Sequence, residues 1–460
     1  MRRRTLLVLF IGLAADSAAL AGEPPTALQT LPVAAAVSCD AKLARARQGW
    51  ADAEHSDLTN DFHKERIEIP DKWCRMWETE GARKEYAAGD FARVLFTGPG
   101  IHPSFAGSLV PGSGPAMGGS FHTEQHPERL RIVESVQAMA STNGSSSVAA
   151  RLFAMGSPSD PTDVMAAREP RRTGSMFIAH QSLTELTYFG SGNDSVSVDR
   201  STFALRRTLA GGALGVPVGH GVTVSAQLSA LSITPDALQG PAFFPTTTSA
   251  ASAPLTGESR YAVYGGGVRF SYPMFFRLRG YSTDAGAVFR QYQGLTGQAT
   301  SYGRADMGWS NSFSDSGKFG TVRVGALATL TVVPDGHAVP VALQPTLGGT
   351  DIDGSQVLRS FHDYRFRAPN RLAASIEHER TIKGPLSSLV FADWGGVATR
   401  VSDFDMPHFH RSLGVGVSVH LGGVTVVKAF YAFGGGEGTR TTFTGASDSF
   451  AEPFIRQSIF

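Results

Sequence analysis

The sequence has few charged residues, and neither sign is in excess. Charged side chains make up 18% of the 460 residues, with 41 lysines and arginines against 40 aspartates and glutamates. A soluble domain usually has about 25% charged residues, and a nucleic-acid-binding protein shows a clear basic excess. A disordered chain would have few aromatic residues, whereas they are 10% of this chain. The composition argues against disorder, and we expect no nucleic-acid partner.

Cysteine is almost absent. The two cysteines are Cys39 and Cys74, so a disulfide-rich scaffold and a cysteine-based metal site are excluded. In an oxidising compartment these two residues can form a disulfide, which would stabilise the fold by ~3–4 kcal/mol because it restricts the unfolded chain. Two free thiols are the alternative.

Long apolar runs are lacking as well. No run of 18 or more apolar residues follows the N-terminus, so the sequence contains no candidate transmembrane helix. At the N-terminus, Arg2 to Arg4 precede the apolar run Leu6 to Ala15, and Ala19-Leu20-Ala21 fits a small-x-small cleavage pattern. We predict that residues 1–21 are a secretory signal peptide; the apolar run is too short for the alternative, a membrane anchor. An exported chain of this kind is either soluble or a β-barrel, whose alternating strands escape hydropathy analysis.

The mature chain changes character near residue 105. Residues 22–104 are predicted to form a small, mainly helical periplasmic extension or plug, with charge concentrated in 40–93. From Phe105 onward, segments with a period of two alternate with clusters of Gly, Pro, Asn, Asp and Ser, as strands and turns do. The clearest segment, 413–421, places apolar side chains on one face and small or polar ones on the other.

These segments predict an all-β fold, a transmembrane antiparallel β-barrel of about sixteen strands over residues 105–460. Strands are expected near Gly114, Arg129, Ser145, Gly174, Ser201, Val222, Ser259, Phe275, Ser301, Thr321, His337, Leu372, Leu386, Leu413, Val424 and Arg440. A tilted spanning strand takes ~9–11 residues, which leaves room for connections in a chain of this length. Glycine, at 52 residues, is abundant, and the stretches 265–267 and 434–436 are expected to relieve crowding in a curved sheet. A soluble β-sandwich or propeller is the alternative fold.

Two short motifs lie in residues 344–396. They are Val357-Leu-Arg-Ser-Phe361 and Phe391-Ala-Asp-Trp-Gly395. They resemble motifs of the outer-membrane insertase superfamily, the BamA/TamA-like bacterial surface antigen family. In that family a long loop before the twelfth strand folds into the barrel, and its Val-Arg-Gly-Phe/Tyr arginine meets the carboxylate of a Phe-x-Asp-x-Gly wall motif. The resemblance runs from 344 to about 450; the chain looks like a short, barrel-only subgroup without clear POTRA modules.

The resemblance implies a set of site residues. Arg359 takes the place of the loop arginine and Asp393 that of the wall carboxylate, with the loop 347–369 folding inward. The loop–wall motif comprises Leu358, Arg359, Ser360, Phe361, Glu377, Phe391, Asp393 and Gly395. Ser360 stands where the family has glycine, which permits a positive φ, so a slightly different loop path is expected.

Strand periodicity independently places Asp393. Phe391, Asp393 and Gly395 share one face of the expected strand, whereas Val390 and Trp394 share the other. Asp393 therefore faces the interior if the apolar face meets lipid. A carboxylate there could form a charge-assisted, bidentate bond with a guanidinium. The alternative is a solvated arginine and a carboxylate that lines a wet interior.

Other constellations are weak. His408 and His410 lack an evident third metal ligand, no Gly-x-Ser-x-Gly elbow occurs between a strand and a helix, and the glycine-rich stretches lack a phosphate-binding lysine. We expect no enzymatic activity, no cofactor and no metal.

The resemblance implies protein insertion or translocation, or lipid movement, at the bacterial outer membrane. Its implied partners are outer-membrane lipids, lipopolysaccharide and client proteins. The alternative is a passive pore or a structural surface protein.

Overall fold

The structure is a computed structural model that describes residues 100–445. Gaps fall at 157–170, 238–256, 316–319 and 352–355 and at single positions or pairs in other connections. The chain divides into two units, Met1–Arg83 and Lys84–Phe460, and every described residue belongs to the second. The predicted signal peptide, the helical extension, Cys39 and Cys74 lie outside the described residues. No helix in the described part is long and apolar enough to cross a membrane.

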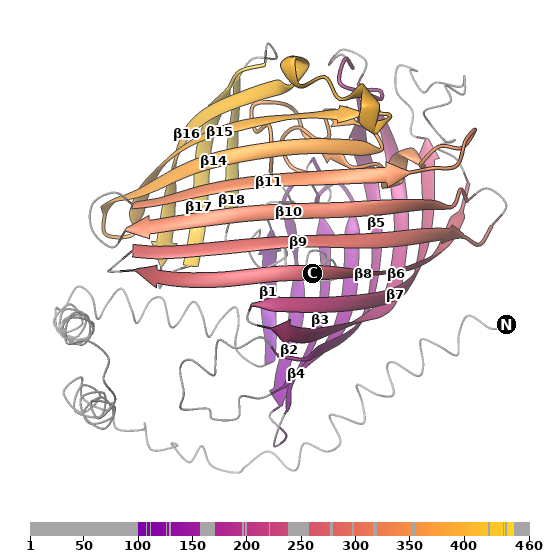
Figure 1. Cartoon of the computed structure of the whole chain (residues 1–460), viewed down its shortest axis with the longest axis horizontal. Coiled ribbons are helices and arrows are strands. Elements are labelled where there is room, and N and C mark those ends of the chain that lie inside the picture. Colours follow the sequence, from indigo (N-terminus) through magenta and orange to yellow (C-terminus); the bar gives the residue numbers. More distant parts are fainter. Residues whose placement is uncertain are drawn as a thin grey trace. The chain divides into compact units, whose positions relative to one another are not determined.

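Sixteen strands form one antiparallel sheet (Figure 1). In sheet order they are β1 (Gly100–Ala106), β2 (Ala116–Gln125), β3 (Leu130–Ser141), β4 (Ser146–Gly156), β5 (Thr173–Tyr188), β6 (Ser201–Gly219), β7 (Val222–Ala237), β8 (Ser259–Phe276), β9 (Arg279–Gly294), β10 (Tyr302–Asp315), β11 (Gly320–Val332), β14 (Asn370–Lys383), β15 (Leu386–Ala398), β16 (His410–Leu421), β17 (Val424–Phe433) and β18 (Thr439–Gly445). A separate ribbon pairs β12 (Thr346–Leu347) with β13 (Phe366–Arg367). Single 3-10 turns are η4 (Val341–Leu343), η5 (Val401–Asp403) and η6 (Met406–His408).

The predicted number of strands is confirmed, but one predicted position is wrong. No strand of the sheet begins near His337, where the chain is irregular apart from η4, and β1 begins at Gly100 instead. Proline explains the missing strand, because its missing N–H cannot complete a ladder in a central strand. Pro334 precedes the expected strand, and Pro340 and Pro345 lie within it. β1 contains Pro103 but lies at the edge of the sheet, where proline is tolerated.

The sheet is strongly curved but does not close. In sheet order β5 is fifth and β15 thirteenth, yet the connections that follow them touch: the Asn193 side chain donates to the His408 carbonyl at 3.0 Å. Within the described residues, however, no ladder joins β1 to β18. Both terminal strands have seven residues, so few backbone groups are available for a closing ladder. The continuous barrel predicted from the sequence is thus observed as a curved sheet with two free edges.

The two ends of the sheet differ. At one, the turn end, β14 and β15 are joined by residues 384–385 alone. At the other, the loop end, residues 333–369 connect β11 to β14; this stretch is called the inner segment below. The connections 189–200 and 399–409 lie at the loop end as well.

One face of the strands is apolar and exposed, as the periodicity predicted. On β16, Leu413, Val415 and Val417 are 44–49% exposed, whereas the alternating residues Ser412 and Gly414 are buried. Further exposed apolar side chains on this outer face include Met176, Leu214, Leu228, Phe289, Ile376 and Val390. An apolar surface repeated over so many strands far exceeds the patches that soluble monomers expose.

Aromatic side chains gather on the outer face towards both ends of the strands. At the turn end these are Phe270, Tyr272, Tyr281 and Phe313. At the loop end they are Trp394, Tyr431 and Phe433, together with Phe404 and the buried Phe409 of the connection 399–409. Neighbouring rings touch, since the Tyr281 and Phe313 centroids are 4.8 Å apart and those of Trp394 and Phe409 are 4.5 Å apart.

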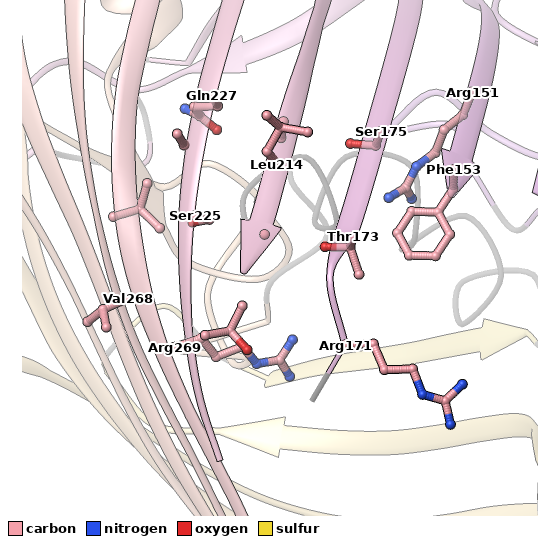
Figure 2. Close-up of a pocket in the computed structure, with 15 residues that line it drawn as sticks. Arg151, Phe153, Arg171, Thr173, Ser175, Leu214, Ser225, Gln227, Val268 and Arg269 are labelled. Carbon is pink, nitrogen blue, oxygen red and sulfur yellow. The ribbon is translucent and has the colours of Figure 1, made fainter. Parts of the chain in front are cut away.

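The inner face is also divided. Near the loop end, apolar side chains of β5 to β8, such as Leu186, Phe203 and Tyr261, form a core with Val341 and Tyr364 of the inner segment. Near the turn end, the inner faces of β4 to β8 border an open recess of about 390 Å³ (Figure 2). The inner segment thus fills one end of the curved sheet.

Glycines on the inner face make room for this packing, which yields a first prediction. A Cβ at Gly414 would lie 2.2 Å from the Phe391 ring, whereas a Cβ at Gly308 would meet nothing within 4 Å. Gly414→Ala should destabilise the fold by roughly 1–3 kcal/mol through overpacking. Gly308→Ala, the matched control, should have little effect. The urea midpoint of the detergent-refolded chain measures both, and equal midpoints would contradict the packing.

Candidate functional site

The inner segment folds back on itself and then contacts the inner face of the sheet, which is called the wall below. The backbone N–H of Tyr364 donates to the carbonyl of Gly348 at 3.2 Å, and β12 pairs with β13. Leu358 and Tyr364 adopt left-handed backbone conformations, with φ of 57° and 61°. Such a conformation costs a non-glycine residue ~1–2 kcal/mol, so the packing around both buried side chains must hold it in place.

Ser360 does not need the conformational freedom of the family's glycine. Among the described residues other than glycine, a positive φ occurs at Leu358 and Tyr364 but not at Ser360. Its N–H donates to Ser412 Oγ on β16 at 2.8 Å. The serine therefore fits, and the unusual backbone lies two residues earlier than the motif suggested.

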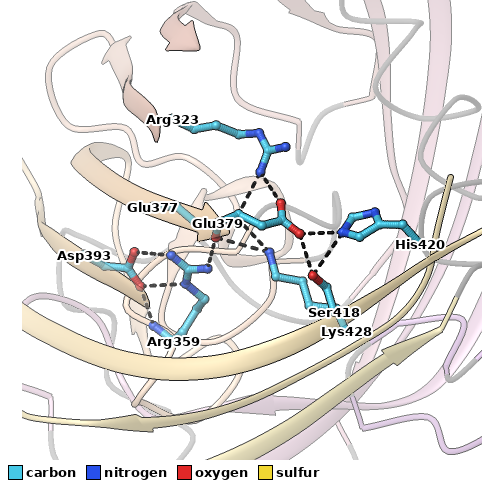
Figure 3. A network of polar contacts seen from close by, with 8 residues as sticks. All are labelled: Arg323, Arg359, Glu377, Glu379, Asp393, Ser418, His420 and Lys428. Carbon is cyan, nitrogen blue, oxygen red and sulfur yellow. Dashed lines mark hydrogen bonds and ion pairs between the residues drawn. The ribbon is translucent and has the colours of Figure 1, made fainter. Parts of the chain in front are cut away.

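Arg359 is the central contact of the inner segment (Figure 3). Its Nε donates to Asp393 Oδ2 at 3.0 Å and its Nη2 to Asp393 Oδ1 at 2.9 Å, which is a bidentate pair. Its backbone N–H also donates to Oδ2, at 3.1 Å, and its Nη1 donates to Glu377 Oε2 at 2.7 Å. Asp393 lies on β15 and Glu377 on β14, so one arginine joins the segment to two strands of the wall.

Because both side chains are buried, the charges of Arg359 and Asp393 need each other as partners. The Asp393 side chain is fully buried and that of Arg359 is 5% exposed. The Arg359 guanidinium also stacks on Phe391, 3.4 Å from the ring centroid. Burial alone would lower the pKa of Arg359, but its bonds to Asp393 and the charges of Asp393 and Glu377 raise this pKa above its usual value. Arg359 is therefore held as a cation, and loss of Arg359 would leave the buried Asp393 carboxylate without its bidentate partner.

Further ion pairs and hydrogen bonds lie next to this pair on the inner face of the sheet. Lys428 on β17 donates to Glu377 at 3.0 Å, and Arg323 on β11 donates to Glu379 at 2.8 Å. Ser418 and His420 on β16 also contact Glu379. These contacts link side chains from β11, β14, β15, β16 and β17 to the inner segment (Figure 3).

A second group of ions holds the earlier part of the inner segment. Asp351 accepts from Arg371 Nη1 on β14 at 2.6 Å, and Arg371 Nε donates to Thr329 on β11. Thr329 in turn donates to Asp306 on β10, which pairs with Arg290 at 2.7 Å. A continuous series of ion pairs and hydrogen bonds between side chains therefore connects the inner segment to β9.

A third group holds the later part. Arg365 Nη1 donates to Ser195 Oγ at 2.7 Å, and Arg365 also pairs with Glu437. Arg440 on β18 donates to the Phe361 carbonyl at 2.7 Å and to Asp363 at 2.6 Å. The segment thus touches the last strand of the sheet and the connection after β5.

The remaining motif residues pack around Arg359. The Phe361 ring lies against Gly435, where a Cβ would come within 1.8 Å of it, and its centroid is 5.1 Å from that of Phe366. Leu358 is completely buried. Gly395 lies close to β14, since a Cβ there would be 2.8 Å from the Leu372 carbonyl. The structure therefore brings all eight motif residues to one region.

Sequence reasoning missed several residues of the site. Arg371 and Lys428 lie on the inward faces of β14 and β17, so strand periodicity could have found them. Asp351 and Arg365 lie in irregular chain, where no period marks an inward side chain. Arg440 lies on an edge strand, and its contact with Asp363 spans 77 residues.

The histidines of the described part of the chain were candidates for a metal site or a serine triad. It holds no group of three or more His, Cys, Asp or Glu that could bind a metal. His408 contacts Asp405, whereas His410 donates to the Asn193 carbonyl at 3.0 Å. Ser418 and Glu379 approach the same nitrogen of His420, Nε2, whereas a serine triad uses opposite sides of the ring.

The sequence and the fold show limited similarity to known proteins. No protein-family model and no curated protein matches the chain. Among solved structures, it is similar to BamA from Haemophilus ducreyi lacking POTRA domains 1–3, at 13% identity and a TM-score of 0.48, covering 75% of this chain and 69% of that one. CdiB from Acinetobacter baumannii gives 10% identity and 0.44, and CdiB from Escherichia coli 11% and 0.43; both cover 75% of this chain. The match spans 58% and 61% of those CdiB chains, and with all TM-scores below 0.5 no family or activity is assigned.

The buried pair yields a second prediction. Arg359→Ala should cost ~3–5 kcal/mol of unfolding free energy, because Asp393 would remain buried without its partner. A double-mutant cycle with Asp393→Ala should return a large favourable coupling. Arg260→Ala, which removes an exposed arginine paired with Glu258, is the matched control and should change little. Additive effects of the two substitutions would contradict direct coupling.

Proposed function

We propose that the chain is a β-barrel of the bacterial outer membrane that acts on other polypeptides, or on lipids, at its free strand edges. The membrane part of the proposal is supported by the alternation of the strands. Their outer faces carry exposed apolar side chains, and their inner faces carry paired charges, glycine and small polar groups. Hydrocarbon accepts the first face, whereas charges need the partners that the second face provides.

The aromatic groups at both ends support the same placement. Tyrosine and tryptophan collect at the two membrane–water interfaces of barrels, and a spanning strand needs ~9–11 residues. β5 to β8 have 16 to 19 residues and therefore extend beyond the hydrocarbon. Their outer faces turn polar towards the loop end, where Arg206 pairs with Asp236 and Arg260 with Glu258.

The contrast between the ends supports an orientation. Outer-membrane barrels have short periplasmic turns and longer extracellular loops. We therefore place the turn end in the periplasm and the loop end outside. In this orientation the inner segment occupies the outer half of the interior.

The observation that carries the proposed activity is the pair of free edges. β1 and β18 have no sheet partner on their outer edges within the described residues. An unpaired edge is a template on which an incoming strand can pair. The resemblance of residues 344–396 to the insertase superfamily implies the same mode of action. Contacts of Arg440 with Phe361 and Asp363 attach β18 to the inner segment, so the segment can brace one side of this seam.

The apolar outer face yields a third prediction. Val415→Arg should destabilise the membrane-inserted protein by ~2–4 kcal/mol, because arginine would face hydrocarbon. Thr202→Arg, on the outer face of β6 near the polar loop end, is the matched control and should change little. Folding into phosphatidylcholine vesicles, followed by heat-modifiable gel migration across a urea series, measures both. Identical migration of boiled and unboiled wild-type protein would contradict a barrel.

The activity yields a fourth prediction. The full-length chain, reconstituted in proteoliposomes, should speed the folding of a urea-denatured outer-membrane barrel above the rate in empty liposomes. Arg359→Ala should reduce this rate, whereas the control Arg260→Ala should retain it. Stable, ion-selective conductance that survives Arg359→Ala, without faster folding of the client, would instead identify a passive pore. The absence of both effects would leave lipid movement or a structural role.

A further inference from the structure

The last two strands of the sheet are attached to the inner segment at the loop end. These strands, β17 and β18 with the connection 434–438, are called the terminal hairpin below. We infer that Arg365 and Arg440 are positioning residues that hold the loop end of this hairpin, so that the edge strand β18 moves by a swing of its turn end. The inference deepens the proposed function, and only its part in strand pairing rests on that proposal.

Arg440 attaches the edge strand itself. Its Nη1 donates to the Phe361 carbonyl at 2.7 Å, and its Nη2 donates to Asp363 Oδ2 at 2.6 Å. The other carboxylate oxygen of Asp363 accepts from the backbone N–H of Thr350 at 2.8 Å. One carboxylate therefore joins β18 to a turn of the inner segment, through charge-assisted bonds, which are stronger than bonds between neutral groups.

Glycines on both partners make this close approach possible. Gly349 of the inner segment lies beside the Arg440–Asp363 pair and has a left-handed φ of 58°. A Cβ at this position would collide with Arg440 Nη1 and Asp363 Oδ1. On the hairpin, the Phe361 ring leaves no room for a Cβ at Gly435. A side chain at either glycine would therefore push the hairpin away from the segment.

Arg365 joins the terminal hairpin to the opposite part of the sheet. Its Nε donates to Glu437 of the hairpin, its Nη1 to Ser195 Oγ at 2.7 Å, and its Nη2 to the Ser195 carbonyl. Ser195 follows β5, the fifth strand of the sheet, whereas Glu437 precedes β18, the sixteenth. The Arg365 side chain is buried among these partners. One side chain thus connects two distant parts of the sheet across its interior.

Both attachments lie at one end of the hairpin. Arg440 is the second residue of β18, which continues for five residues to Gly445 at the turn end. At a rise of ~3.4 Å per residue, Gly445 lies about 17 Å from the attachment. Over this length the ladder with β17 holds one side of the backbone, and the other side is an edge of the described sheet. A strand that is held at one end opens most easily at the other.

The attachment therefore gives the edge a direction of opening. The loop end of β18 stays fixed on the inner segment, while the turn end can separate from its surroundings. In the orientation proposed above, the turn end lies on the periplasmic side. An extended polypeptide that arrives from that side would meet the mobile half of β18 first and pair towards Arg440.

Hydrogen exchange of the full-length chain, refolded in detergent and measured by mass spectrometry, tests the inference. Exchange of ladder amides reports the free energy of local opening. In the wild type, protection along β18 should fall from Arg440 towards Gly445. Arg440→Ala should speed exchange at the loop end of the hairpin about tenfold, because it removes charge-assisted hydrogen bonds. Arg440→Lys keeps the charge without the fork of donors, so its effect should be smaller.

Thr441→Ala is the matched control. Thr441 lies on the same strand but pairs with Tyr431 on the exposed outer face, so its exchange should equal that of the wild type. Amides of β9 and β10 are the internal reference and should keep their protection in every variant. Equal exchange of β18 in the wild type and Arg440→Ala would overturn the inference, as would uniform protection along β18. An equal loss of protection in β9 and β10 would also overturn it, because Arg440 would then support the whole fold.

The exchange measurement needs no client, so the two proposals can fail separately. If the wild type does not speed the folding of a client barrel, the proposed function fails while the exchange result stands. If it does, Arg440→Ala should reduce that rate and Thr441→Ala should retain it. An unchanged rate in Arg440→Ala, beside faster exchange of β18, would overturn the part of the inference that concerns strand pairing.

Discussion

A carboxylate with no exposure to solvent organises the interior of this protein. Asp393 faces inward from β15 and needs a cation, because a buried unpaired charge would cost several kcal/mol. Arg359 of the inner segment supplies a bidentate contact. This one pair brings the segment to the wall, aligns Arg359 on Phe391 and requires a residue without a side chain at Gly414. Much of the packing at the loop end follows from satisfying that charge.

The width of the sheet explains why such a segment is needed. Side chains alone fill the interior of a barrel of about eight strands, whereas sixteen strands enclose much more space. The inner segment fills one end of that space, where Tyr364 and Val341 meet the apolar inner faces of β5 to β8. Three separate ionic groups attach it, centred on Arg359, Arg371 and Arg365. Several independent attachments therefore hold the segment against the inner face of the sheet.

The two ends of the interior therefore have different chemistry. The loop end has an apolar core and buried ion pairs, whereas the turn end has an open recess, where Arg269 forms a half-exposed ion pair with Asp284. On the outer surface, aromatic groups border the apolar zone at both ends of the strands. The interior is thus differentiated along the length of the strands.

The sequence by itself determined the strand class, the number of strands and the direction of individual side chains. Alternation along 413–421 and 391–395 was enough, because a strand side chain points to one of only two faces. The resemblance added Arg359, a residue of irregular chain for which periodicity predicts nothing. The signal peptide, the helical extension and the pairing of Cys39 with Cys74 remain predictions.

Only the tertiary structure decided the rest. It placed β1 at the edge, where Pro103 is tolerated, and left the strand expected near His337 unformed. It paired Arg371 with Asp351 and Arg440 with Asp363, and it gathered Arg151, Arg171 and Arg269 around one recess. Such contacts join side chains from strands and connections that are far apart in the sequence. Local periodicity determines which face a side chain occupies, but the curvature of the whole sheet determines what stands opposite it.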